Sequence, residues 1–311
     1  MRDTFIRTLS ELASTDSRVL LLTADLGYTV LETFAERNPD QFFNVGVAEQ
    51  NMVGLATGLA EAGFIPFVYS IATFASLRPY EFIRNGPIMH RLPVRIVGIG
   101  GGFEYGSAGP THHALEDVGA WRMQPDLCLI APADSSQAGS ALRATWDLSA
   151  PIYYRLGKNE KAKVPGLNGD FELGRAQRVR DGNDLVIVTM GGIAVEAVAA
   201  AELLSADGIE AAVVVVASVN PAPLEDLAVI LARFPLVITV EAHYIVGGVG
   251  SLVAEIIAER GIDCRLERCG VRSGARGMSG SERSLNAANG ISRERLADTA
   301  KRVMASFPAV P

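Results

Sequence analysis

The sequence predicts an α/β protein of two domains, each built on a largely parallel β-sheet. Short apolar runs alternate with helical patterns along the chain, which is typical of parallel sheets with helices on both faces. A polar stretch at 158–180 without clear periodicity divides two such series and is interpreted as a linker. The length of 311 residues also suits two domains or one large α/β unit.

The first series supplies the elements of an N-terminal domain. Its strands are apolar runs bounded by Gly, Pro or Asp, expected at 19–23, 65–69, 94–99, 127–131 and 152–154. Its helices are expected at 30–37, 52–61, 77–89 and 135–147. Pro79 lies in the first turn of the third helix, where a missing N–H is tolerated.

The second series supplies a C-terminal domain. Its strands are expected at 185–190, 212–217 and 236–240, and its helices at 195–204, 224–233 and 251–260. We place the division near Asp170, so that one domain covers residues 1–170 and the other covers residues 171–311.

Composition narrows the class of function. A formal net charge of −7 argues against a nucleic-acid-binding surface, which needs clustered Lys and Arg. Cys128, Cys264 and Cys269 fit neither a disulfide framework nor a zinc motif, which favours a reducing compartment. With no signal core and no membrane-length apolar run, a soluble cytoplasmic protein is expected. The hydrophobic fraction of 49% suggests burial against a partner chain, although an Ala-rich core gives a similar figure.

The segment FNVGVAEQN at 43–51 is the most informative part of the chain. It places Glu49 between a short apolar strand and the start of a helix rich in small residues. The positive end of the helix dipole and the apolar neighbours make this an unusual place for an acid. A basic group is therefore expected to dock on Glu49. A glutamate that only caps the helix is the simpler alternative.

This segment, the aromatic residues after it and a GPTH turn at 109–112 together resemble the transketolase family of thiamine-diphosphate enzymes. The likeness extends over nearly the whole chain, but only to the C-terminal part of a full-length transketolase. It implies a pyrimidine-binding thiamine-diphosphate fold for residues 1–170. It implies a transketolase C-terminal-like domain for residues 171–311.

The resemblance also implies how the cofactor is held. Thiamine diphosphate reacts through a carbanion that its own aminopyrimidine generates in the imino tautomer, and a carboxylate on the pyrimidine ring nitrogen stabilises that tautomer. Glu49 matches this catalytic glutamate. Phe74 and Tyr80 match the aromatic pocket around the pyrimidine, with Leu77 at a position that is often aromatic. An ordinary core stripe at helical spacing is the alternative for these residues.

Three further residues match family positions that contact the substrate or lie near the cofactor and the subunit interface. His112 matches the histidine that binds the donor oxygen and helps to move protons. Asp25 matches a position near the cofactor and the subunit interface, with a turn-capping role as the alternative. Arg155 matches an arginine that binds substrate phosphate, for which a guanidinium fork is suited. His113, expected to be structural or exposed, and His243, expected to be structural, are not assigned to the site.

Two departures from the family pattern affect substrate choice. Ala108 stands where transketolases have an aspartate that reads a donor hydroxyl, and Gly100 stands where a phosphate-binding histidine is expected. We therefore expect that ordinary ketose phosphates are not the best donors, or that other residues read their polar groups. The substrate class remains sugars or sugar phosphates.

The larger departure is the missing metal and diphosphate motif. Family members bind Mg²⁺ or Ca²⁺ and the diphosphate through a GDG segment and a later Asn, and no GDG occurs in this sequence. Because the resemblance begins near residue 1, the sequence predicts the C-terminal subunit of a split transketolase. An N-terminal transketolase-like subunit would carry the GDG…N motif and hold most of the metal site. The expected assembly is an α2β2 heterotetramer that transfers a two-carbon ketol unit from a ketose to an aldose.

Three alternatives remain open at the level of sequence. A β-subunit of a 2-oxo acid dehydrogenase decarboxylating component shares the two-domain plan and the glutamate. Deoxyxylulose-phosphate synthase shares the AEQ motif but normally carries both halves on one chain. A non-catalytic scaffold subunit would keep the fold without the activity, although such a protein has no use for both Glu49 and His112.

Overall fold

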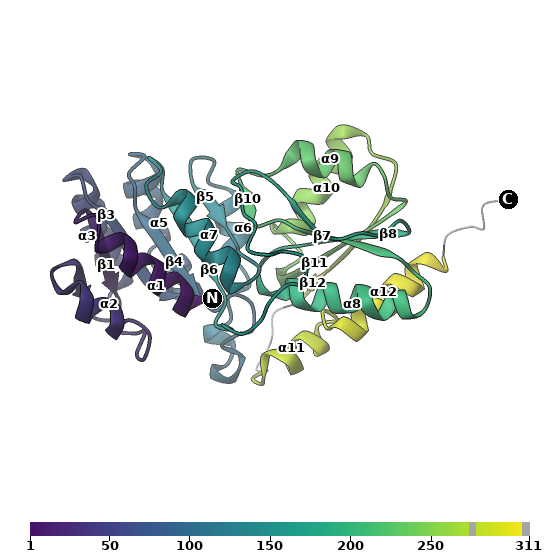
Figure 1. Ribbon diagram of the computed structural model, residues 1–311, viewed down its shortest axis with the longest axis horizontal. Helices are drawn as coiled ribbons and strands as arrows, with labels where there is room; N and C mark the ends of the chain where they lie inside the picture. The colour runs from purple at the N-terminus through teal and green to yellow at the C-terminus, as the bar shows by residue number, and fades with distance from the viewer. Residues whose placement is uncertain (274–277, 307–311) are drawn as a thin grey trace.

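The computed structural model describes residues 1–273 and 278–306, which form two adjoining α/β units (Figure 1). The N-terminal unit contains α1 (Arg2–Ala13), β1 (Val19–Thr23), α2 (Glu32–Arg37), β2 (Phe42–Asn44), α3 (Glu49–Glu61), β3 (Ile65–Ile71), α4 (Ala72–Leu77), α5 (Tyr80–Ile83), β4 (Arg95–Ile99), α6 (Asp117–Arg122), β5 (Cys128–Ile130), α7 (Ser135–Thr145) and β6 (Ile152–Leu156). The C-terminal unit contains β7 (Gln177–Arg180), β8 (Leu185–Thr189), α8 (Ala194–Ala206), β9 (Ala211–Val215), α9 (Leu224–Leu231), β11 (Leu236–Tyr244), α10 (Val249–Arg260), β12 (Arg265–Val271), α11 (Glu282–Ala288) and α12 (Arg293–Met304). Between β9 and α9, β10 (Ser218–Asn220) crosses over and pairs with the sheet of the N-terminal unit. No helix within the described residues is long and apolar enough to cross a bilayer.

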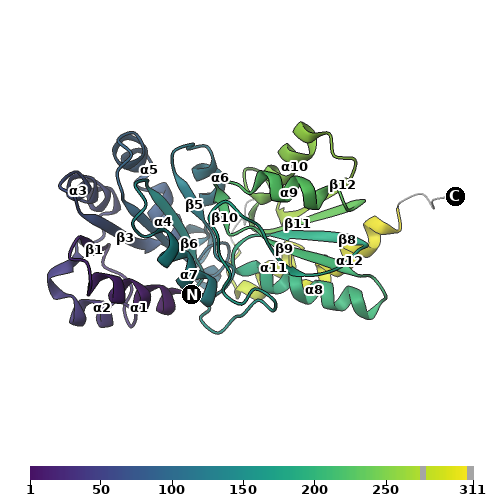
Figure 2. The ribbon, with the colours of Figure 1, turned by 45° about the horizontal axis from the view of Figure 1, so that its top comes forward.

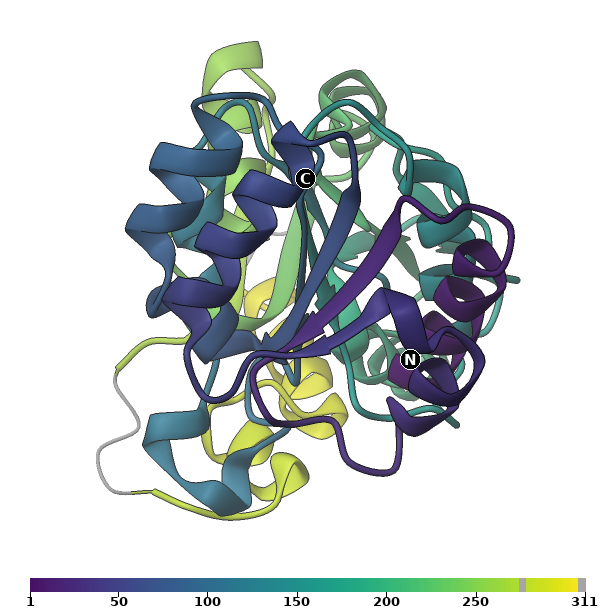
Figure 3. The same cartoon turned by 90° about the vertical axis from the view of Figure 1, so that its left-hand side faces the viewer.

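The first sheet has the strand order β10-β5-β6-β4-β3-β1-β2. Its pairs are parallel except that β10 runs antiparallel to β5. Because successive side chains of a strand face opposite sides, Leu20 and Leu22 pack into the core beneath α3, whereas Val19 and Leu21 pack beneath α1. Figure 3 shows helices on both sides of this twisted sheet. This is the α/β fold that the sequence predicts.

The second sheet has the strand order β12-β11-β8-β9-β7, with β7 antiparallel to β9 and the other pairs parallel. Helices α8 and α12 lie side by side on one face, and α9 and α10 cover the other (Figure 2). The apolar runs of β8, β9 and β11 are buried along their whole length apart from the last residue of β11, as expected for strands covered on both faces.

The two units share one continuous core. Val68 and Ile96 of the first sheet belong to the same buried cluster as Val186 and Val214 of the second. The strand predicted at 212–217 is present as β9, which ends two residues earlier, at Val215. The short β10 that follows at Ser218–Asn220 joins the first sheet and was not predicted. The predicted linker is also too long, since its last residues form β7. The division near Asp170 stays a prediction.

The predicted helix at 77–89 is wrong in its bounds. The structure has α4 before Pro79, α5 after it, and a π-helical turn at Arg84–Ile88 that contains Pro87. Proline lacks an N–H and clashes with the carbonyl four residues earlier, so it interrupts a regular helix. The break matters for the site, because α4 carries Phe74 directly from the end of β3.

Candidate functional site

Glu49 is the first residue of α3 and follows the carboxyl end of β2, at the edge where parallel sheets place ligands. Asn44 fixes the turn before it, because its Oδ1 accepts hydrogen bonds from the N–H groups of Asp25 and Gly46, both at 3.1 Å. Gly46 has a φ of 74°, which favours glycine. Asp25 accepts from the Asn44 amide at 2.9 Å and lines a cavity of about 170 Å³ beside it. Asp25 therefore supports the turn that positions Glu49, and its contact with a cofactor stays a prediction.

The Glu49 carboxylate is 3% exposed and has two partners. The hydroxyl of Ser70, near the end of β3, donates a hydrogen bond to Glu49 Oε1 at 3.3 Å. One guanidinium nitrogen of Arg78 donates to Oε1 at 2.8 Å and to Oε2 at 2.9 Å. The buried negative charge is therefore compensated by an arginine whose side chain is 44% exposed. The basic partner expected from the sequence is supplied here by the chain itself.

The rings of Phe74 and His112 lie next to Arg78 and Glu49, and these four residues form the Glu49 cluster. The guanidinium carbon of Arg78 lies 3.9 Å from the centroid of the Phe74 ring, a cation–π contact. The His112 ring meets Phe74 edge-on, with 5.1 Å between centroids. His112 ends the short 3₁₀ turn after the GPTH glycine, and its Nδ1 lies 3.0 Å from the Thr111 hydroxyl. The structure thus brings Glu49, Phe74 and His112 together at the carboxyl ends of the strands.

The other predicted pocket residues lie less directly in the cluster. The Tyr80 ring stacks on Trp121 at 4.9 Å, and its hydroxyl donates to the Ala120 carbonyl at 3.2 Å and accepts from Gln124 at 2.7 Å. Tyr80 is therefore anchored to α6. Leu77 is 45% exposed and offers an apolar surface. Contact of either residue with a pyrimidine stays a prediction.

Arg155 is placed apart from the cluster. It is 5% exposed, and its Nε donates to Asp117 at 2.8 Å. Its Nη2 donates to the carbonyls of Ala114 and Ala242, both at 3.0 Å. Ala242 belongs to β11, so Arg155 links the two units. This bonding favours a structural role over the substrate-phosphate contact expected from the sequence.

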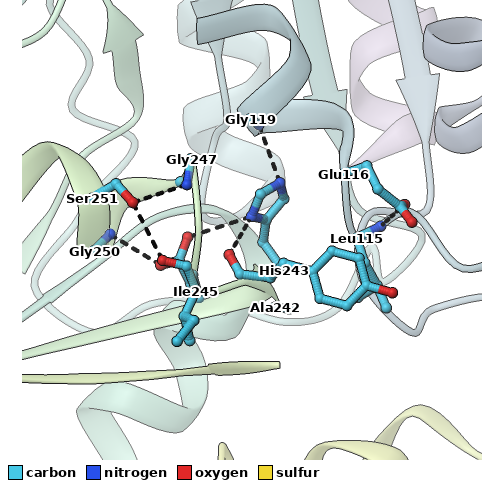
Figure 4. Close-up of polar contacts among 12 residues, drawn as sticks. Leu115, Glu116, Gly119, Ala242, His243, Ile245, Gly247, Gly250 and Ser251 are labelled. Carbon is cyan, nitrogen blue, oxygen red and sulfur yellow. Dashed lines mark hydrogen bonds and ion pairs between the residues drawn. The ribbon is translucent and has the colours of Figure 1, made fainter. Parts of the chain in front are cut away.

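Two histidines outside the cluster are buried. Both ring nitrogens of His113 are enclosed, and burial lowers its pKa, so it is structural rather than exposed. His243 Nε2 accepts from the Gly119 N–H at 3.1 Å, and its Nδ1 lies 2.6 Å from the Tyr244 carbonyl (Figure 4). These contacts assign the proton to Nδ1. Burial lowers the pKa of His243, which keeps it neutral and structural, as the sequence suggests.

Glu241 lies beside His243 and faces the start of α10. Its Oε1 accepts from the Gly250 N–H at 3.0 Å, so a carboxyl group occupies the glycine-rich helix start. The side chain is fully buried, and burial raises its pKa to about 7 although two backbone N–H groups oppose the shift. The folded chain therefore binds the Glu241 proton more tightly than the unfolded chain does.

We expect Glu241 to make the protein less stable as the pH rises. A raised pKa contributes stability that is complete below the unfolded value and is lost as the pH rises through about 7. The Glu241→Gln variant stays neutral, so relative to it the wild-type protein should lose about 2 kcal/mol of unfolding free energy between pH 5 and pH 8. Denaturant titration at several pH values measures this difference. Equal pH slopes for wild type and variant contradict it, and Glu202→Gln at an exposed site of α8 is the control.

Comparison with known proteins decides the family. The family models for “Transketolase, pyrimidine binding domain” and “Transketolase, C-terminal domain” match residues 1–162 and 174–296. The chain belongs to the transketolase family. A “Putative transketolase C-terminal section” from Methanocaldococcus jannaschii is 36% identical over 98% of this chain and 95% of that protein. One of the subunits of an apulose-4-phosphate transketolase from Phocaeicola vulgatus is 35% identical over 85% of this chain and 86% of that protein.

A solved structure supports the same assignment. It is described as a “Split gene transketolase, inactive beta4 tetramer”, is 31% identical, and superposes with a TM-score of 0.88 over 98% of both chains. The predicted fold, a transketolase pyrimidine-binding domain followed by a transketolase C-terminal domain, is confirmed. The chain is a transketolase-type subunit of a thiamine-diphosphate-dependent family.

The cluster fits one half of thiamine diphosphate. A buried carboxylate near an aromatic ring suits a planar aminopyrimidine, whose protonated or imino form needs an acceptor for its ring N–H and a face to pack on. Within the described residues no group of three or more His, Cys, Asp or Glu side chains could hold a metal ion. The residues around Glu49 therefore fit the pyrimidine, whereas the described residues offer no such group of side chains for the metal.

Arg78 is the charged site residue that the sequence analysis missed. Phe74 and Arg78 are four residues apart, a spacing that brings side chains together on a helix. The predicted helix began at residue 77, which separated the two residues. Placing the helix start directly after β3 would have revealed the pair.

Proposed function

We propose that this chain is the C-terminal subunit of a two-component transketolase that moves a two-carbon ketol unit from a ketose donor to an aldose acceptor. The observation that carries the proposal is the buried Glu49 carboxylate at the strand ends, which Arg78 links to the Phe74 ring and so to His112. The family match and the relatives named as transketolase subunits support the reaction type.

The residues of the cluster have distinct proposed roles. Thiamine diphosphate, when bound, supplies the carbon nucleophile that carries the two-carbon unit. Glu49 shares a proton with the pyrimidine ring nitrogen: its carboxylate would accept a hydrogen bond from the ring N–H that only the imino or protonated form carries, and so favours the imino tautomer. Phe74 and Leu77 pack on the ring, while Tyr80 supports that wall from its contacts with α6. His112 binds the donor oxygen and moves a proton at that atom.

A partner subunit is part of the proposal. An N-terminal transketolase-like chain with the GDG…N motif would hold the diphosphate and Mg²⁺ or Ca²⁺, in a cytoplasmic α2β2 heterotetramer. Support comes from the lack of a metal-binding group among the described residues and from relatives named as separate subunits. It also comes from apolar side chains exposed near the site, including Phe43, Val47 and Leu77.

Donor choice follows from the loop around His112. Ala108 and Gly100 supply neither the acid nor the histidine that ordinary transketolases use for ketose phosphates. Arg155, the remaining candidate for phosphate, is bound to Asp117 and to two carbonyls. We propose that the best donor is not an ordinary ketose phosphate, or that the partner chain reads its phosphate.

Reconstitution tests this function. The isolated chain should show no ketol transfer, and adding an N-terminal subunit with the GDG…N motif, thiamine diphosphate and Mg²⁺ should restore it, measured by chromatography of the sugar products. Turnover by the chain alone, or decarboxylation of a 2-oxo acid with reduction of a lipoyl domain, would point to another function. In the same assay, a clear preference for xylulose 5-phosphate over unphosphorylated ketoses would contradict the donor proposal alone.

A further inference from the structure

We infer that Arg78 occupies the place of the cofactor's aminopyrimidine in the unliganded chain, so that cofactor binding requires Arg78 to leave Glu49. The inference rests on the proposed role of Glu49 and adds a regulatory contact to that site. It starts from three observations: the bonding of Arg78, its packing, and its exposure.

The bonding and packing of Arg78 resemble those expected of a pyrimidine. A guanidinium is planar, carries a positive charge and presents N–H donors. Arg78 donates to both oxygens of Glu49, at 2.8 and 2.9 Å, and lays its guanidinium carbon 3.9 Å from the Phe74 ring centroid. An aminopyrimidine is also planar and, in its protonated or imino form, would present a ring N–H to the same carboxylate. Since Arg78 uses both oxygens of Glu49, the two groups compete for one position.

The burial of the Glu49 carboxylate determines the balance between two states, one with Arg78 bound to Glu49 and one with Arg78 in solvent. A carboxylate that is 3% exposed is costly without a partner, which favours the Arg78 contact in the unliganded chain. The Arg78 side chain is 44% exposed and follows the last residue of α4. It can therefore rotate into solvent without crossing the core.

The expected consequence is a weaker apparent affinity for the pyrimidine. A ligand that binds only the open fraction f has an apparent Kd equal to the intrinsic Kd divided by f. If Arg78 is closed for roughly 90–99% of the time, the apparent Kd rises about tenfold to a hundredfold. Removing Arg78 removes this competition.

The test is a calorimetric titration of the full chain with hydroxymethylpyrimidine, the aminopyrimidine half of thiamine. Arg78→Ala should bind it about tenfold or more tightly than wild type. Arg78→Gln is a neutral variant that keeps amide donors for Glu49, and its affinity should lie between those of wild type and Arg78→Ala. It replaces Arg78→Ala in the test if the alanine variant does not fold. Affinity of the folded variants equal to or below that of wild type, or no binding by them, overturns the inference.

Two further variants separate this inference from the proposed function. Arg143 is an exposed arginine away from the site, and it forms an ion pair at 2.9 Å with Glu11 of α1. Arg143→Ala should therefore leave the affinity for hydroxymethylpyrimidine unchanged. Glu49→Gln in the Arg78→Ala background should abolish the gain. If Glu49→Gln binds the pyrimidine as well as its parent, the proposed role of Glu49 fails. If Glu49→Gln weakens binding but Arg78→Ala does not strengthen it, only the Arg78 inference fails.

Discussion

Glu49→Gln in the reconstituted enzyme is expected to lower turnover by about a hundredfold or more, with the fold intact. Glutamine has nearly the same shape as glutamate but cannot exchange a proton with the pyrimidine ring nitrogen, and such proton-transfer groups contribute about 10²–10⁴-fold to rates. The kcat for ketol transfer measures the loss, and melting temperature reports the fold. Arg78 should remain solvated in the variant because its side chain is already 44% exposed.

The control for this prediction lies on the same helix. Glu61 ends α3 and is exposed, so Glu61→Gln should leave turnover unchanged. A Glu49→Gln enzyme with turnover within a few fold of wild type would remove Glu49 from the proposed role. No turnover by the wild-type pair with any ketose would favour the scaffold alternative.

The long strands of the fold could be predicted because burial on both faces leaves a clear signal. β1, β3, β4, β8 and β11 are apolar over most of their length. β2 and β10 have three residues each, which is too short for periodicity, and β10 pairs with a strand almost ninety positions earlier. β12 carries Arg265, Glu267 and Arg268 at an edge of its sheet, where one side needs no partner strand.

The site residues that could be predicted are those whose residue type and local sequence already indicate a chemical role. Glu49 stands out as an acid among apolar residues, and His112 follows a GPTH turn. The environments of Arg78 and Arg155 depend on tertiary placement instead. One arginine is half-exposed on the Glu49 carboxylate, and the other is buried between the units. Their sequence neighbourhoods do not distinguish these outcomes, because burial is set by packing of segments far apart in the chain.

Arg155→Met is expected to destabilise the protein by about 3–5 kcal/mol, because it removes one partner of a buried ion pair. Asp117 is 1% exposed, and its carboxylate also accepts from the Tyr153 hydroxyl at 2.8 Å. Burial would raise the pKa of Asp117, but the Arg155 guanidinium outweighs it and holds the pKa below its usual value. Without Arg155, the Asp117 charge and the carbonyl of Ala242 lose their partner between the two units. Denaturant unfolding measures the loss.

A matched surface pair and a second variant make the Arg155 prediction specific. Arg175 and Asp226 form an ion pair at 2.7 Å, close to the 2.8 Å of Arg155 and Asp117, but Arg175 is exposed. Arg175→Met should therefore change stability little, since exposed pairs are solvated. Adding Asp117→Asn to Arg155→Met should recover part of the lost stability, because no buried charge is then left unpaired. If Arg155→Met instead keeps wild-type stability and raises KM only for phosphorylated donors, then Arg155 binds substrate phosphate as the sequence first suggested.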